Sequence, residues 1–134
     1  MVETTASLME AGAVPPASSV QALADLARSL PHTTGVTVQA GGVIIRTNRD
    51  TVAEVMLILR DDARFSFEQL LDLWWMEWPR RPRRFDVVYN LLSVSFNHRL
   101  RVVVSTDEPA SVPSVSGLWP CAAWWEREIS HGLT

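Results

Sequence analysis

Four arginines lie within five residues of this sequence, in the run RRPRR at residues 80–84. Guanidinium groups so close together can hold phosphates, or they can dock on an acidic protein surface. No interleaved aromatic residues and no RNA-binding signature accompany the run. We therefore interpret Arg80, Arg81, Arg83 and Arg84 as a solvated loop or a docking patch for an acidic partner, in preference to a nucleic-acid site.

Six tryptophans form two groups, and each group contains an adjacent pair: Trp74, Trp75 and Trp78, then Trp119, Trp124 and Trp125. Neighbouring side chains in regular structure point in different directions, so at least one member of each pair should lie near the surface. Exposed tryptophan and arginine are typical of protein–protein hot spots, and packing in the core is the alternative of equal weight. The C-terminal candidates for a partner interface are Trp119, Pro120, Trp124, Trp125, Glu126, Arg127 and Glu128.

The remaining reactive side chains do not form a recognisable site. None of His32, His98 and His131 is spaced with another metal ligand, and His98 should be a solvated or turn-bonding residue at a hairpin end. Cys121 has Pro120, Ala122 and Ala123 as neighbours, which favours a small packing thiol over a nucleophile. We predict no catalytic, cofactor-binding or metal residues in this chain.

Composition indicates one globular domain with a real core, since 134 residues carry 47% hydrophobic side chains. The net charge of −3 gives no strong field toward nucleic acid. A single cysteine excludes an internal disulfide and favours a reducing compartment. No apolar run approaches the ~20 residues of a membrane-spanning helix, and residues 1–18 should be a flexible tail without a targeting signal.

The elements that must position these residues follow from hydrophobic periodicity. The spacing predicts a helix over 19–30, a β-hairpin over 36–45 and a second helix over 50–61 that begins with a capping box of Thr51 and Glu54. Ser66 and Gln69 repeat the capping-box spacing, so a short helical turn carrying Leu70 and Leu71 should follow, and then an extended segment to residue 78.

Two further strands are predicted over 84–94 and 99–105, and a helix from Leu118. In the second strand Arg99 and Arg101 share one face. The order is helix, two strands, helix, three strands, helix. It indicates a two-layer α+β fold with one mixed sheet and the helices mainly on one face.

Four segments resemble the family of the 30-kDa subunit of respiratory complex I, which is the C subunit of bacterial NADH-quinone oxidoreductase. They are RFDVVYNLLS at 84–93, NHRLRV at 97–102, VPSVSGLWP at 112–120 and WWERE at 124–128, in the family's order and spacing. Residues 19–83 fit more weakly, through the order of elements and RFSFEQLLDL.

The resemblance implies a non-catalytic, cofactor-free subunit in the peripheral arm of the proton-translocating enzyme. FMN and iron–sulfur clusters, which carry electrons from NADH to quinone, would lie in partner subunits. The chain would dock against the D (49-kDa-like) and B subunits on the cytoplasmic side of the bacterial inner membrane, with no nucleic acid and no membrane span of its own.

The sequence departs from the family pattern in two places. WWMEWP at 74–79 replaces a CGVDYP-like segment, and ISHGLT at 129–134 replaces an Asp-x-x-Phe-Gly stretch and a GHPDLRRIL signature. We therefore expect a family-like domain over 19–129, a non-family end over 130–134 and a C-terminal truncation. The alternative is an orphan truncated α+β domain that acts as an adaptor or has no function.

Overall fold

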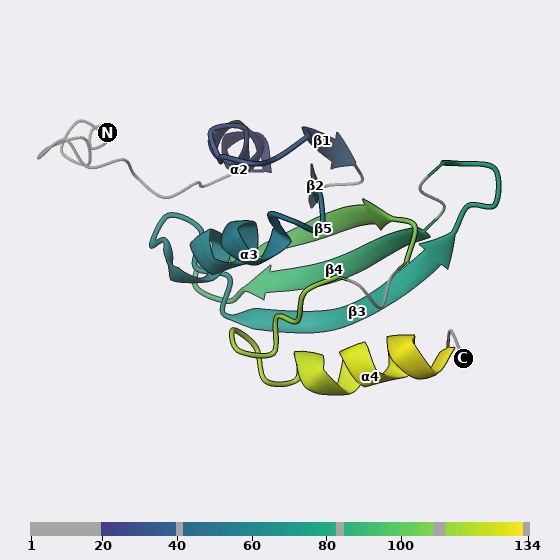
Figure 1. Ribbon diagram of the computed structural model, residues 1–134. Coiled ribbons are helices and arrows are strands. Elements are labelled where there is room, and N and C mark those ends of the chain that lie inside the picture. The colour runs from purple at the N-terminus through teal and green to yellow at the C-terminus, as the bar shows by residue number, and fades with distance from the viewer. Residues whose placement is uncertain (1–19, 40–41, 83–84, 109–111, 133–134) are drawn as a thin grey trace, which may run out of the picture.

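Three helices and a five-stranded sheet make up the computed structural model, which describes residues 20–39, 42–82, 85–108 and 112–132 (Figure 1). In chain order the elements are α2 (Val20–Ala27), β1 (Gly35–Gln39), β2 (Gly42–Thr47), α3 (Val52–Asp61), β3 (Gln69–Glu77), β4 (Phe85–Ser93), β5 (His98–Thr106) and α4 (Ala122–Gly132). The predicted α+β class and the predicted order of elements are confirmed. The predicted tail over 1–18 lies outside the described residues.

The strands follow the order β1-β2-β5-β4-β3 across the sheet. Among these strands β2 and β5 pair in parallel, and the other three pairings are antiparallel, so the sheet is mixed as predicted. Strand β5 comes last in the sequence but therefore lies in the middle of the sheet, between β2 and β4.

One face of the sheet carries the core. Side chains alternate between the two faces of a strand, so the register places Ile45, Val102, Tyr89 and Leu73 in one row across four strands. All four are buried, and they belong to one hydrophobic cluster together with the buried residues of α2 and α3. We call this side of the sheet the core face.

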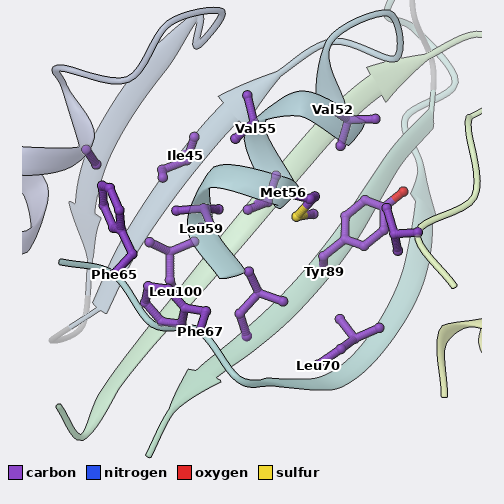
Figure 2. Close-up of a cluster of buried hydrophobic side chains, with 14 of the residues drawn as sticks. Ile45, Val52, Val55, Met56, Leu59, Phe65, Phe67, Leu70, Tyr89 and Leu100 are labelled. Carbon is purple, nitrogen blue, oxygen red and sulfur yellow. The ribbon is translucent and has the colours of Figure 1, made fainter. Parts of the chain in front are cut away.

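Helix α3 covers the core face with one stripe of side chains. Val52, Val55, Met56 and Leu59 recur at helical spacing and are fully buried. Figure 2 shows Met56 and Leu59 over the strands that carry Tyr89 and Leu100. Each such side chain stabilises the fold by about 1.5–3 kcal/mol, so this stripe fixes α3 on the sheet.

Residues 70 and 71 differ from the prediction, because they begin strand β3 and form no helical turn. Leu70 pairs with Leu91 and is buried, and a β-bulge follows at Leu71. Ser66 has a positive φ of 48° and its hydroxyl donates to the carbonyl of Ala63, so it does not cap a helix. Burial of Leu70 outweighs the local capping pattern.

The capping box at the start of α3 is also absent. The Thr51 hydroxyl makes no helix-capping bond and instead lies 2.8 Å from the Thr47 hydroxyl and 3.1 Å from Asn48 Oδ1. The helix begins at Val52. The first predicted helix is shorter than expected, since α2 stops at Ala27 and the amides of Ser29 and Leu30 form tighter turns with the carbonyls three residues before them.

His98 and α4 also differ from their predicted positions. His98 is buried with 8% exposure and pairs with Ser93 in the β4–β5 ladder, so the expectation of a solvated histidine is wrong. Helix α4 begins at Ala122 and not at Leu118, since residues 115–119 form turns that close on the carbonyl of Val115.

Candidate functional site

The loop after β3 is tied to the sheet by one carboxylate. We call residues 78–82 the basic loop. Asp86 accepts hydrogen bonds from Arg81 Nη2 at 2.6 Å, Ser105 Oγ at 2.8 Å and Trp78 Nε1 at 3.1 Å. The Arg81 guanidinium also lies 5.4 Å from the centre of the Trp78 ring. Arg81 is therefore committed to holding the loop.

The electrostatics of Asp86 explain why a carboxylate can lie there with only 8% of its side chain exposed. Burial tends to raise the pKa of Asp86, but the hydrogen bonds from Arg81 and Ser105 outweigh burial and hold the pKa below its ordinary value. The group is ionised at neutral pH, and its charge is neutralised by Arg81.

The predicted docking arginines thus separate into different roles. Arg80 is exposed on the basic loop beside Trp78, which is 43% exposed, so both can contact a partner. Arg81 is bound to Asp86. Arg83 and Arg84 lie outside the described residues.

Helix α4 has an inner and an outer side within the WWERE segment. Trp125 packs partly against the core, and the Glu126 carboxylate accepts from Ser114 Oγ at 2.7 Å and from the Val115 amide at 2.8 Å. Trp124 is 52% exposed and meets Trp125 edge-on, with the ring centres 4.8 Å apart. Glu126 therefore ties α4 to the preceding segment, and Trp124 faces outward.

The remaining C-terminal candidates divide between surface and core. Pro120, Arg127 and Glu128 are exposed. Trp119 is only 3% exposed and its indole N–H donates to the Phe67 carbonyl at 3.2 Å, so it is a core residue and offers no surface to a partner. The reason is that the turns over 115–119 direct Trp119 onto the sheet.

Cys121 also departs from its prediction. It is exposed and not packed, and its thiol donates to the carbonyl of Leu70 at 3.5 Å.

Figure 1 shows α4 along the lower side of the sheet beside β3, and the β3–β4 loop at the upper right. The two predicted patches are therefore separate surfaces.

The Trp74–Trp75 pair lies across the sheet, one ring on each face. Trp75 packs against the core cluster and meets Phe85 edge-on at 5.4 Å between ring centres. Trp74 lies on the opposite side, where the Arg101 guanidinium is 5.9 Å from its ring centre. For both pairs of adjacent tryptophans, the expectation of different directions is confirmed.

The face opposite the core, which we call the outer face, carries a polar network that the sequence did not reveal. Arg101 Nε donates to Asn90 Oδ1 at 3.0 Å, and Asn90 Nδ2 donates to Asp72 Oδ1 at 2.6 Å. The alternation of Arg99 and Arg101 signalled such a face. The other members of the Arg101 network could not be found without the register, because Asn90 and Asp72 come from two other strands.

The described residues contain no group of three His, Cys, Asp or Glu side chains that could hold a metal ion. None of the three described helices is long and apolar enough to cross a membrane.

A family model for the respiratory-chain NADH dehydrogenase, 30 Kd subunit, matches residues 45–131. That range runs from β2 through the basic loop into α4, so it covers well over half of the chain. The chain belongs to this 30 Kd subunit family. The resemblance drawn from the sequence motifs is confirmed.

Curated relatives carry the name of the same enzyme, as the C subunit of NADH-quinone oxidoreductase. The protein of Hyphomonas neptunium is 42% identical over 113 residues, which cover 81% of this chain and 56% of the relative. That of Paramagnetospirillum magneticum is 44% identical over 115 residues, and that of Caulobacter vibrioides is 45% identical over 104 residues. These two alignments cover 81% and 78% of this chain, but 58% and 53% of the relatives, so the chain spans about half the length of the curated relatives it matches.

A solved structure supports the fold of this 30 Kd family member. It is a chain in the structure of the membrane-bound sulfane sulfur reductase, an archaeal respiratory membrane complex, with a TM-score of 0.64 at 18% identity. The match covers 81% of this chain and 64% of that one. At this identity the likeness concerns the arrangement of helices and strands alone.

Proposed function

We propose that this chain is a non-catalytic subunit of the peripheral arm of the proton-translocating NADH:quinone oxidoreductase, and that it docks against the 49-kDa-like (D) and B subunits. The observation that carries the proposal is the family match over residues 45–131. The match includes the second half of β2 and the whole of β3, β4 and β5, together with both predicted docking surfaces.

The surface chemistry supports a docking role. Trp124 is 52% exposed and Trp78 43% exposed, each next to charged exposed side chains such as Arg127 and Arg80. Isolated soluble domains seldom leave tryptophan this exposed, whereas interfaces concentrate their binding energy on tryptophan and arginine. We assign these two surfaces to contacts with neighbouring subunits.

In this proposal the chain supplies structure to the enzyme and takes no part in the chemistry. Electrons would pass from NADH through the FMN and iron–sulfur centres of partner subunits to quinone. The chain would sit on the cytoplasmic side of the bacterial inner membrane, held there through the complex.

Co-purification tests this proposal. The tagged chain is co-expressed with the 49-kDa-like and B subunits, and a full-length relative from Caulobacter vibrioides is treated in parallel as the positive control. We expect the 49-kDa-like subunit to be retained by both. Retention by the full-length relative together with none by this chain would contradict the proposal and favour the orphan domain.

Substitutions at the two surfaces show where the contact lies. Trp124→Ala and Arg80→Glu change exposed side chains, and each should weaken retention of its partner. Arg28→Glu, at an exposed position just after α2, is the matched control and should leave retention unchanged.

A further inference from the structure

The outer face contains a groove with its own chemistry. Its volume is about 400 Å³, and it crosses the sheet from the β1–β2 end to β3. The register explains its floor, because Ile44, Arg101, Asn90 and Asp72 form one row across four strands. Arg99 lies two residues before Arg101 on β5 and therefore shares the same face of the sheet.

None of the three described helices covers this groove. Val88 and Val103 belong to the next row of the outer face, and they are buried without joining the cluster that contains the helix residues. Arg46 and Trp74 flank these two valines in the same row. The helices lie on the core face, and the polar row stays open.

Arg101 is held in position before any partner arrives. Its Nε donates to Asn90 Oδ1, while Asn90 gives its own N–H to Asp72, which fixes the orientation of the amide. The guanidinium also lies over the Trp74 ring at 5.9 Å. Among the described residues the two terminal nitrogens of Arg101 have no acceptor, so the side of the guanidinium fork that grips a carboxylate remains available.

The charge balance of the groove favours an acidic occupant. Asp72 is the one carboxylate among the described residues that line the groove, and it already accepts from Asn90. Arg99 and Arg101 add two positive charges, and the side chain of Arg99 has no partner in the described part of the chain. Ile44 and Leu71 supply apolar surface at the two ends of the groove. Leu71 reaches this face because of the β-bulge in β3.

We propose that this groove binds an acidic segment of another subunit of the complex. An aspartate or glutamate would rest on Arg101 and Arg99, with apolar neighbours against Ile44 and Leu71. This inference rests on the proposed function for the source of the partner. Its chemistry, a carboxylate-bearing peptide, can be tested without that partner.

The first test uses a defined probe and the full chain. Acetylated hexaglutamate amide is titrated into ¹⁵N-labelled protein at low salt, with hexalysine and inorganic phosphate as separate controls. We expect saturable shifts at Ile44, Asn90 and Arg101 with hexaglutamate only. Equal shifts with phosphate would show a general anion site, and absence of shifts at these residues would show no site. Either result overturns the proposal.

Matched variants sharpen that test. Arg101→Glu and Arg99→Glu should each weaken hexaglutamate binding by about tenfold or more, while Arg28→Glu makes the same charge change beside α2 and should have no effect. Arg101→Lys keeps the charge but loses the planar guanidinium fork, and it should bind hexaglutamate more weakly than the parent. Full affinity in Arg101→Lys would refute the role of the preorganised fork. Because the Arg99 side chain makes no described polar contact, its variant should fold normally, as a thermal melt would verify.

The second test separates the groove from the proposed function. Retention of the 49-kDa-like and B subunits is compared for the parent chain, Arg101→Glu and Arg28→Glu. Failure of the parent chain to retain either of them counts against the proposed function, while the hexaglutamate result still decides the groove's chemistry. Retention by the parent and equally by Arg101→Glu would refute the groove as the place where these subunits bind. Loss of self-association in Arg101→Glu, with the 49-kDa-like subunit still retained, would identify a second copy of this chain as the occupant and overturn the proposal.

Discussion

The two faces of the sheet are built from the same strands and carry opposite chemistry. Along β4, Val87, Tyr89 and Leu91 meet the helices, while Asp86 and Asn90 point the other way into hydrogen-bonded networks. The core face gains stability from apolar area removed from water. The outer face holds its carboxylates in hydrogen bonds, Asp86 with Arg81 and Asp72 with Asn90, and leaves arginine side chains accessible. The same register therefore produces a structural side and a recognition side.

The largest expected effect on the free energy of unfolding comes from a substitution that creates a cavity on the core face. Leu59→Ala removes a fully buried side chain of α3 and should lower the free energy of unfolding by about 3 kcal/mol, through lost burial and the cavity left behind. Leu57→Ala on the same helix is the matched control, because Leu57 is 45% exposed. Its effect should stay within about 0.5 kcal/mol. Urea unfolding followed by circular dichroism measures both, and equal effects would contradict the placement of α3.

The outer face should also contribute to stability, though less, through Asp86. Asp86→Asn removes the charge that Arg81 neutralises and disturbs three hydrogen bonds, so we expect a loss of about 2 kcal/mol in the free energy of unfolding. The same urea experiment measures it. An unchanged free energy of unfolding would mean that water replaces these hydrogen bonds without loss of stability and that Asp86 does not fix the basic loop.

The Asp86 contribution should also depend on pH. Its folded-state pKa lies below the unfolded value of about 3.9, so the stabilisation is complete above about pH 5 and is lost as the pH falls through the folded pKa. The difference in unfolding free energy between the parent and Asp86→Asn should therefore be largest near neutral pH and shrink below about pH 4. A difference that grows on acidification would contradict the lowered pKa.

Substitution of the buried Trp119 should have a smaller effect on the free energy of unfolding. Trp119→Phe keeps most of the buried ring but loses the bond to the Phe67 carbonyl, and it should cost about 1–2 kcal/mol of stability. Chemical unfolding of the purified variant provides the value. A cost near zero would mean that the Phe67 carbonyl finds another donor.

Trp124→Ser should leave stability nearly unchanged, because the side chain is half exposed. Its effect should appear in association. We expect weaker self-association at high concentration, since an exposed aromatic side chain adds to a sticky surface. Sedimentation velocity compares the variant with the parent. Stronger association in the variant would count against this surface.

Local patterns predicted the elements well where burial and periodicity agreed, as along α3 and β4. They failed where a long-range partner decided the outcome. Leu70 is a strand residue because it pairs with Leu91, and Trp119 is a core residue because the Phe67 carbonyl accepts its N–H. The exposed positions of Arg80 in the RRPRR run and of Trp124 in the WWERE segment could be anticipated from the sequence. The network around Arg101 was not, because its members lie on three strands that are brought together only by the sheet register.

The central place of β5 has a consequence for how the chain must assemble. Strands β1 and β2 form an early hairpin, but β2 finds its parallel neighbour only in β5, which lies more than fifty residues later in the sequence. During synthesis the free backbone edge of β2 therefore stays hydrogen-bonded to water until β5 has left the ribosome and can pair with it. Such distant pairing makes loop closure the slow step, so we expect the β4–β5 hairpin to form early and β2 to join it late in folding.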